Sequence, residues 1–370
     1  MYDVAIIGGG LAGLVNGILL KKAGLSVILF EEKSYPFHRV CGEYISNEVI
    51  PFLKVHDLFP AELEPAIISK FHLTSVSGKS LKMDLDLGGF GISRYAFDAW
   101  LAKKAMATGV DIHEKERALD FRFENDTFEL ETSKGIYTAR VLIGSFGKRT
   151  KLDKELGRKF IQKSSPYLGV KYHVSTSLVE DDIIELHNFS GGYCGISRVE
   201  NNTYNLCYLS HRSNLKAHKE ISQMEEAVLF RNPFLKRIFS ESEFLFGKPE
   251  VINEISFKRK EPVFNHMLMS GDSAGMITPL CGNGMAMAIH SSKILSTLIK
   301  GYFGNELNRD QLENAYVSEW SKNFAARHWA GRKIQSLFGS AAASEFGVGL
   351  GRTIKPVAKY LMSKTHGRPF

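Results

Sequence analysis

The stretch Met1–Gly13, MYDVAIIGGGLAG, decides the fold of this chain. Val4–Ile7 is a short apolar run with β-branched residues, which predicts a buried strand. It leads into Gly8, Gly10 and Gly13 at GxGxxG spacing, directly before a helical pattern. The first glycine permits a sharp bend, the second admits phosphate to backbone N–H groups, and the third lets the helix pack on its strand. The segment therefore predicts a dinucleotide pyrophosphate at a helix N-terminus.

A second apolar strand, 26–30, follows the helix and ends at Glu31 and Glu32. An acid about twenty residues after the glycine turn is placed to accept hydrogen bonds from ribose hydroxyls. The backbone of Leu11 and Ala12, which opens the helix, is expected to face the pyrophosphate. Strand, turn, helix, strand and acid in this order favour a Rossmann-like nucleotide-binding unit over a glycine-rich turn without a ligand.

Composition indicates a folded globular enzyme with two joined domains. A chain of 370 residues exceeds the usual size of one core, and 44% hydrophobic with 24% charged residues is ordinary for such a protein. The N-terminus already belongs to the first strand and no run of eighteen apolar residues occurs, so we expect a cytoplasmic protein. The four cysteines form no CxxC pair, which predicts free thiols and no zinc site.

The net charge of +7 is concentrated toward the C-terminus, where residues 310–370 hold nine Lys or Arg against four Asp or Glu. The favoured interpretation is a helical region with a solvated basic face, and the alternative is contact with an anionic membrane or an acidic partner. No nucleic-acid reading motif accompanies the charge, so nucleic acid is not expected as a partner. The membrane alternative is based on apolar residues that stand beside basic ones. The apolar residues are Phe338, Phe346, Val348, Leu350, Ile354, Val357, Tyr360 and Leu361, and the basic residues are Arg352, Lys355, Lys359 and Lys364.

Periodicity along the chain predicts two sheets. The first part should contain a hairpin at 71–86 that turns at 77–78, a helix at 94–108 with Tyr95, Trp100 and Leu101 inward, a meander at 118–123, 127–132 and 136–139, and a returning parallel strand at 141–144. The second part should contain antiparallel strands at 169–177, 183–188, 193–199 and 203–209, helices at 219–230 and 234–239, and a strand at 250–257. The last part should contain a strand at 265–270, a glycine-rich loop at 271–284 and a helix at 285–300.

The block MLMSGDSAGMITPLCGNGMAMAIHSSKIL, residues 267–295, repeats the strand, glycine loop and helix arrangement. It resembles the GDAA...P..GxG motif of FAD-dependent monooxygenases, halogenases and geranylgeranyl reductases, through Gly271–Ala274, Pro279 and the pair Gly282 and Gly284. The resemblance implies that Asp272 bonds the ribityl chain of FAD and that the backbone of Gly284 and Met285 faces the flavin. A helix N-terminus there would stabilise the reduced, anionic flavin.

A third segment, PFHRVCGEYIS, is similar to the CGG or CGE segment of the geranylgeranyl reductases. In that family the arginine reaches FAD and the cysteine-glycine loop lines the substrate side. This implies those positions for Arg39, Cys41 and Glu43, with Cys41 a candidate catalytic thiol beside a flavin that carries the chemistry. Arg94 matches the R..FD..L element of these flavoproteins, whose arginine lies near the cofactor, and it equally fits an i,i+4 pair with Asp98.

Two segments depart from the family patterns. Ser145–Gly147 stands where the hydroxylases carry an Asp-Gly pair tied to nicotinamide use, which argues against NADPH reduction in their manner. Tyr193–Arg198 keeps only the tyrosine and isoleucine of the reductases' YxWxFP signature, so the prenyl substrate does not carry over, although Tyr193 is expected in the substrate pocket. The tryptophans lie outside any WxWxIP motif, so halogenation is a minor hypothesis.

These observations predict an α/β protein with a discontinuous Rossmann-like FAD-binding domain, a second α+β substrate domain with an antiparallel sheet, and C-terminal helices. The expected bounds are 1–65, 90–160 and 260–310 for the first domain, 66–89 and 161–259 for the second, and 311–370 for the helices.

The predicted function is an FAD-dependent oxidoreductase that acts on a largely apolar small molecule by hydride transfer, with NAD(P)H a candidate electron donor. The alternative is a monooxygenase that uses a flavin hydroperoxide. A flavin-dependent halogenase and a non-enzymatic flavoprotein are the lesser possibilities.

Overall fold

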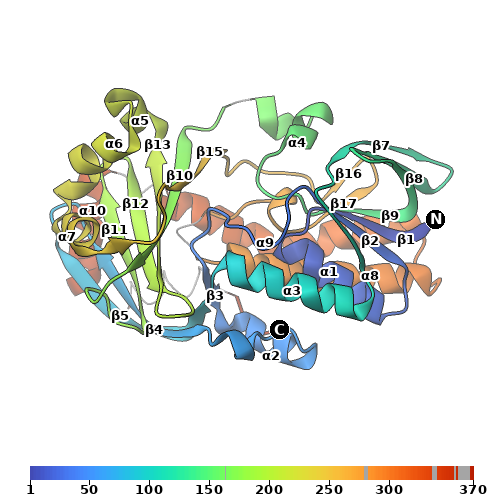
Figure 1. The fold of residues 1–370 in the computed structure, drawn as a ribbon, viewed down its shortest axis with the longest axis horizontal. Helices are drawn as coiled ribbons and strands as arrows, with labels where there is room; N and C mark the ends of the chain where they lie inside the picture. Colours follow the sequence, from blue (N-terminus) through green and yellow to red (C-terminus); the bar gives the residue numbers. More distant parts are fainter. Residues whose placement is uncertain (163, 279–281, 336–339, 354–355, 357–366) are drawn as a thin grey trace.

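Two β-sheets lie side by side in the computed structural model, each covered by helices (Figure 1). The structure describes residues 1–370 except 163, 279–281, 336–339, 354–355 and 357–366. In Figure 1 the sheet that carries the N-terminus lies on the right, and the sheet with β4, β5 and β10–β13 lies on the left. The mixed α/β class predicted from the sequence is confirmed.

The first sheet brings together strands from both ends of the chain. Its strand order is β16-β17-β9-β1-β2-β6, and β9 also pairs with β8, which pairs with β7. The central pairings of β1 with β2, β1 with β9, and β9 with β17 are parallel. The strands are β1 (Tyr2–Ile7), β2 (Val27–Glu31), β6 (Asp111–Glu114), β7 (Ala118–Glu124), β8 (Thr127–Thr132), β9 (Ile136–Gly144), β16 (Val263–Phe264) and β17 (Met267–Met269).

The predicted strands 136–139 and 141–144 are one continuous strand, β9, because no turn residue interrupts them at Arg140. Its first half pairs antiparallel with β8, and its second half pairs in parallel with β1. One strand therefore serves both the meander and the nucleotide-binding sheet.

Three helices pack near the first sheet: α1 (Leu11–Lys22), α3 (Arg94–Thr108) and α8 (Gly284–Phe303). The buried Asn16 joins the two glycine-rich motifs, because its Nδ2 donates to Ser270 Oγ at 3.1 Å and to Ser292 Oγ at 3.0 Å. On α3, Trp100 and Leu101 are buried as expected, but the inward placement of Tyr95 is wrong, since its side chain is 41% exposed. Tyr95 lies in the first turn of α3, where its ring stacks on His38 instead of facing the core.

The second sheet has the strand order β14-β10-β13-β12-β11-β4-β5-β3, and β15 pairs with β10. The four central antiparallel strands and the β4–β5 hairpin confirm the sequence expectation, and β4 joins the sheet by a parallel pairing with β11. The strands are β3 (Tyr44–Ser46), β4 (Ala66–Thr74), β5 (Ser80–Gly91), β10 (Tyr167–Ser175), β11 (Ile183–Phe189), β12 (Gly192–Arg198), β13 (Tyr204–His211), β14 (Glu243–Phe244) and β15 (Glu250–Ile255).

Strand β3 pairs with β5 in the second sheet although the sequence groups its residues with the nucleotide-binding segment. Short helices pack against the second sheet, and α10 contacts β4, β5 and β11. The remaining helices are α2 (Ile50–Val55), α4 (Lys151–Glu155), α5 (Arg212–His218), α6 (Ile221–Val228), α7 (Pro233–Glu241), α9 (Arg309–Gln335) and α10 (Ala341–Thr353). The 3₁₀ turns are η1 (Asn47–Val49), η2 (Ala61–Leu63), η3 (Lys159–Gln162), η4 (Leu229–Arg231) and η5 (Gly271–Ser273).

Within the described ranges, no helix combines the length and apolarity needed to cross a bilayer. The domain bounds and the cytoplasmic location stay predictions.

Candidate active site

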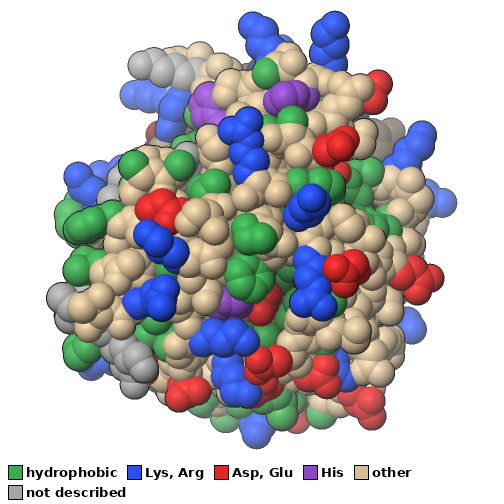
Figure 2. Space-filling view, turned by 90° about the vertical axis from the view of Figure 1, so that its left-hand side faces the viewer, with side chains coloured by type: hydrophobic (Ala, Val, Ile, Leu, Met, Phe, Trp, Pro, Cys, Tyr) green, Lys and Arg blue, Asp and Glu red, His purple; other side chains and the backbone are tan. Residues whose placement is uncertain are grey.

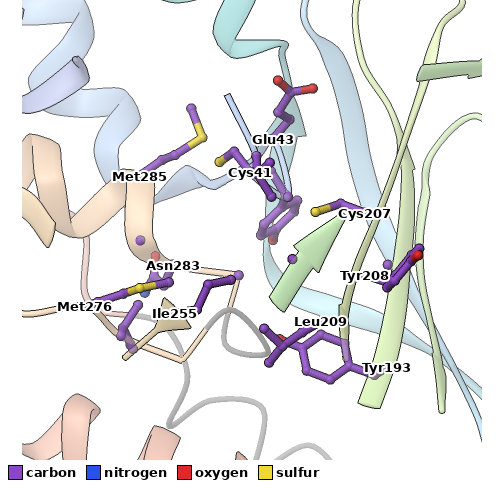
Figure 3. A pocket seen from close by; sticks show the side chains of 18 of the residues that line it. Cys41, Glu43, Tyr193, Cys207, Tyr208, Leu209, Ile255, Met276, Asn283 and Met285 are labelled. Atoms are coloured by element: carbon purple, nitrogen blue, oxygen red, sulfur yellow. The ribbon is translucent and has the colours of Figure 1, made fainter. Parts of the chain in front are cut away.

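A cavity of about 790 Å³ lies where loops of the first sheet meet one face of the second sheet (Figure 3). Most of the residues singled out in the sequence line it, although they come from segments far apart in the chain. Those residues are Gly10, Leu11, Ala12, Glu32, Arg39, Cys41, Glu43, Arg94, Tyr193, Asp272, Gly282, Gly284 and Met285. Gly8, Gly13 and Glu31 stand behind this wall. Their individual roles toward a cofactor or substrate stay predictions.

The glycine turn after β1 is built as its spacing predicts. Gly8 has φ +99°, and a Cβ there would lie 2.6 Å from the carbonyl oxygen of Ser145. A Cβ on Gly13 would lie 2.0 Å from the carbonyl oxygen of Gly8, so the helix can pack here only with glycine. A Cβ on Gly10 would meet no atom closer than Arg94 Nη2 at 3.3 Å. Gly10 thus leaves space on the cavity side, whereas the other two glycines are needed by the protein itself.

Two helices begin at the cavity, and in the described part of the chain neither has a side-chain hydrogen bond from its N-cap residue. The N-cap of α1 is Gly10 and that of α8 is Asn283, and neither helix has an acid in its first turn. Helix N-termini of this kind present N–H groups and partial positive charge to an anion. The residues therefore fit FAD, whose pyrophosphate the N-terminus of α1 would hold and whose flavin ring the N-terminus of α8 would hold.

Glu31 is tied to the turn rather than exposed to the cavity. Its Oε2 accepts hydrogen bonds from the Gly9 N–H and from Arg39 Nη2, each at 3.0 Å. Arg39 Nε also lies 3.3 Å from Asp98 Oδ2. Arg94 forms a bidentate ion pair with the same Asp98, at 2.7 Å and 2.6 Å, and also lines the cavity. The i,i+4 pair with Asp98 is therefore confirmed, whereas the proximity of Arg94 to the cofactor stays a prediction.

Glu43 is the centre of a buried charged cluster that sequence reasoning missed. Its Oε2 lies 2.7 Å from His173 Nε2. Its Oε1 contacts Lys171 Nζ and accepts a hydrogen bond from the backbone N–H of Arg94 at 2.8 Å. Burial alone would raise the pKa of Glu43, but the Lys171 ammonium and His173 lower it below its ordinary value. Lysine and histidine at alternate positions of a strand point to the same face, which is the signal that could have indicated this cluster.

His38 lies beside this cluster and lines the cavity. Its ring is 5.2 Å from that of His173, and burial together with the Lys171 and His173 charges lowers the pKa of His38 to about 4. The imidazole of His38 is therefore neutral at physiological pH.

Two thiols line the same cavity. Cys41 is labelled in Figure 3 and is partly buried. Its carbonyl oxygen accepts a hydrogen bond from Asn205 Nδ2 at 3.1 Å. Cys207 on β13 also lines the cavity, and burial raises the pKa of its thiol to about 12. Both are free in this structure, as is Cys194. Cys281, the fourth cysteine, lies outside the described residues.

The second-sheet side of the cavity is apolar. Tyr193, Leu209, Ile255 and Met276 pack in one cluster and are labelled together in Figure 3. Phe71, Leu73, Leu81, Met83 and Leu85 extend this surface along β4 and β5, and Phe346, Val348 and Leu350 of α10 complete it. The cavity therefore joins a half built on glycine turns and helix N-termini to an apolar half.

Ser145, which departs from the hydroxylase pattern, has a role in the turn. Its Oγ lies 3.0 Å from the Ile7 carbonyl oxygen and 2.8 Å from the Gly8 carbonyl oxygen. The hydroxyl therefore secures the glycine turn to the end of β9, where an aspartate would bring negative charge against carbonyl oxygens.

The apolar C-terminal residues that suggested membrane contact differ in their exposure to solvent. Phe346 is 71% exposed and Leu350 is 38% exposed, but Val348 is buried. Figure 2, which faces the second-sheet end, shows Lys and Arg interspersed with acidic side chains. Arg352, the one basic residue of that group that the structure describes, is exposed. The other members lie outside the described residues, namely Phe338, Ile354, Lys355, Val357, Lys359, Tyr360, Leu361 and Lys364. Membrane contact stays a prediction.

Among curated proteins, the chain is 25% identical over 354 residues to conditioned medium factor receptor 1 of Dictyostelium discoideum, with 88% of this chain and 68% of that protein covered. It is 22% identical over 341 residues to a digeranylgeranylglycerophospholipid reductase of Methanosarcina acetivorans, with 86% and 80% covered.

Among solved structures, a geranylgeranyl bacteriochlorophyll reductase-like protein of Thermoplasma acidophilum superposes with a TM-score of 0.81 at 19% identity, with 100% of this chain and 96% of that chain covered. The flavin-dependent brominase Bmp2 superposes with a TM-score of 0.79 at 19% identity, with 98% and 93% covered. These likenesses confirm the fold expected from the two glycine motifs.

Residues 1–322 match the family model described as FAD binding domain. The resemblance to the geranylgeranyl reductase, monooxygenase and halogenase superfamily is thus confirmed. FAD is the cofactor of this chain. The chain belongs to the FAD binding domain family and is an FAD-dependent oxidoreductase.

Proposed function

We propose that this oxidoreductase transfers a hydride between flavin and a carbon–carbon bond of a largely apolar small molecule, as in reduction of a double bond or its reverse. The observation that carries the proposal is the continuity of the cavity, which runs from the N-termini of α1 and α8 to the apolar wall of the second sheet. A pocket that is mostly apolar selects substrates by shape and burial. Relatives named digeranylgeranylglycerophospholipid reductase add support for the reductive direction.

When bound, FAD supplies the two-electron chemistry, and the chain supplies binding, electrostatics and exclusion of water. The N-terminus of α8 places partial positive charge at the cavity, which favours the reduced anionic cofactor. The apolar side chains of β4 and β12 hold the substrate and keep water away from the reacting carbon atoms. Reduction of a double bond also needs a proton at the second carbon. The Cys41 thiol, on the cavity wall, is the candidate that holds this proton at Sγ.

NAD(P)H is the candidate electron donor within this proposal. Lys148 and Arg149 line the cavity on the loop after β9, where they would attract a phosphate group. Anaerobic mixing of the oxidised holoenzyme with NADPH or NADH tests this, because bleaching of the flavin absorbance follows donor oxidation directly. A flavin that bleaches with dithionite but not with either nucleotide would exclude both donors.

The reaction class is tested with holoenzyme that is photoreduced under argon, with EDTA as the electron donor, and then offered a series of polyene and polyprenyl compounds. Hydride transfer predicts a product that gains two hydrogens without oxygen. The alternative monooxygenase chemistry predicts the opposite, namely no product under argon and a product that carries label from isotopically labelled oxygen gas. The second result would overturn the proposal.

Cys41→Ala tests the proton donor separately. If Sγ supplies the proton, kcat falls by roughly a hundredfold while the Kd for FAD is unchanged. An unchanged kcat would assign the thiol to the cavity wall alone.

A further inference from the structure

Lys260 is a buried cation that bridges two loops of the cavity wall without lining the cavity itself. Its side chain belongs to a residue only 3% exposed, and its Nζ donates to the carbonyl oxygens of Lys148 at 2.6 Å and Asp272 at 2.7 Å. Its Nζ also lies 4.3 Å from the centre of the Phe160 ring. The residue does not line the cavity, yet both carbonyls that it binds belong to residues that do.

Those two carbonyls lie on separate segments that meet at the cofactor side. Lys148 follows β9 and lies 112 residues from Lys260 in sequence, whereas Asp272 belongs to η5 in the second glycine motif. Arg158 reinforces the same region, because its two Nη atoms donate to the Ser273 carbonyl oxygen at 3.1 Å. Two buried cations, Lys260 and Arg158, thus hold the backbone at Asp272 and Ser273, which sets the position of the Asp272 side chain.

The two cations differ in whether they can lose their charge. Arg158 is fully buried and pairs with Asp153 at 2.9 Å. Arginine side chains in general keep their charge over the accessible pH range. Burial lowers the pKa of Lys260 to about 8, against the opposing effect of the Asp153 and Asp272 carboxylates and with the help of the Arg158 and Arg149 charges. Of the two, only Lys260 can therefore change its charge near physiological pH.

We infer that Lys260 is a positioning residue whose protonated side chain holds the two loops in the FAD-binding arrangement, so that affinity for FAD falls when Lys260 loses its proton. Hydrogen bonds from an ammonium to a carbonyl are about twice as strong as those from a neutral amine. The ammonium charge also favours the nearby binding of an anionic cofactor. The inference rests on FAD binding alone and is independent of the proposed reaction and substrate.

The direction of the pH dependence follows from linkage. Below about pH 8 the lysine is charged with or without FAD, so the Kd for FAD is constant. Bound FAD stabilises the charged form and raises the pKa of Lys260 further. Between the pKa of the free protein and that of the complex, binding requires uptake of a proton, and Kd rises by up to about tenfold per pH unit.

The experiment measures the Kd for FAD by fluorescence titration of the apoprotein from about pH 7 to about pH 9.5. Wild-type Kd should stay flat to about pH 8 and then rise about tenfold. Lys260→Arg, which keeps the charge, should bind FAD with a flat profile, and Lys260→Met should be flat with a Kd about tenfold higher at pH 7. Lys258→Met, on an exposed residue of the same segment, serves as the matched control and should follow wild type.

Two results would overturn the inference, namely a flat wild-type profile, or a Lys260→Arg profile that rises as wild type does. A second measurement decides the matter even if neither variant folds. Calorimetry of FAD binding to wild-type protein near pH 8.5, in two buffers of different ionisation enthalpy, should detect proton uptake. Absence of uptake would contradict the role of Lys260.

Discussion

The two halves of the cavity differ in the kind of residues and elements that line them. On the cofactor side the wall is built on the turn at Gly10, the N-termini of α1 and α8, and the loop around Asp272, with polar residues such as Arg39 and Arg94 beside them. On the second-sheet side the wall is made of side chains, among them Tyr193 and Phe71. A wall built on glycine turns requires glycine at fixed positions, whereas a side-chain wall can change with little effect on the fold. This is why the cofactor can be recognised from motifs while the substrate cannot.

The largest effect is expected where the cofactor-side wall is broken. Gly10→Val places a branched side chain in the space that admits pyrophosphate, so FAD binding should be lost, by on the order of 4 kcal/mol or more. The fold should survive, because a Cβ at this position meets only Arg94 within 3.4 Å. Flavin content of the purified protein and circular dichroism measure the two outcomes.

Gly17→Ala is the matched control for this change. It lies on the same helix, the nearest atoms to its added Cβ would be side-chain atoms of Val110 and Ile6 at 3.5 Å or more, and it does not line the cavity. It should retain stoichiometric FAD. Stoichiometric flavin in Gly10→Val would contradict the assignment of this turn to the pyrophosphate.

The joint between the two halves is the next place to test, since Glu43 follows the cofactor-side loop and binds Lys171 and His173 of the second sheet. Glu43→Ala leaves Lys171 and His173 buried without their carboxylate partner and should lower the free energy of unfolding by about 3 kcal/mol. Denaturant unfolding measures this change. Glu180→Ala, which removes an exposed ion pair with Lys82, should cost less than about 1 kcal/mol.

The sign of the pH dependence at Glu43 follows from its lowered pKa. Its contribution to stability is fully present above the unfolded-state pKa, about 4.3, and is lost as the pH falls through the lower pKa of the folded state. The difference in stability between wild type and Glu43→Ala should therefore shrink only in acid. A difference that stays constant down to about pH 2 would show that packing, not charge, accounts for the effect.

The smallest effect is expected on the side-chain wall. Phe71→Ala removes an apolar side chain that lines the cavity and should raise the KM for an apolar substrate about tenfold, with the Kd for FAD unchanged. Ile67→Ala, on an exposed position of the same strand, is the control and should change neither constant. A change in FAD affinity with Phe71→Ala would mean that the two halves are not separable.

Elements with a strong local pattern could be predicted from the sequence. The helix 94–108, the meander and the four antiparallel strands of the second sheet lie where periodicity and turn residues placed them. Misplaced details have identifiable causes. Tyr95 satisfies the helical period but lies in the first turn, beyond the part of α3 that the core covers. Strand β3 is only three residues long, too short for a pattern to reveal its partner β5.

The candidate site was predicted in part, and the division follows sequence distance. The glycines, Asp272, Arg39 and Arg94 belong to compact motifs. All of them line the cavity except Gly8 and Gly13, which stand behind its wall. Lys171 and Lys260 belong to no motif. Lys171 meets Glu43 across 128 residues of chain, and an isolated lysine in a sequence is ordinarily a surface residue. Only the folded chain identifies such residues as buried cations.

By itself, the sequence determined the backbone of the cofactor site, because Gly8, Gly10 and Gly13 satisfy local requirements of turn, approach and packing that no other residue type meets. It also determined the periodicity of the strands and helices around that site. The tertiary structure alone decided which charges are buried together, namely Glu43 with Lys171 and His173, and Lys260 behind Asp272. The reason is physical: backbone geometry is set by neighbouring residues, whereas the energy of a buried charge depends on partners that only folding brings within reach.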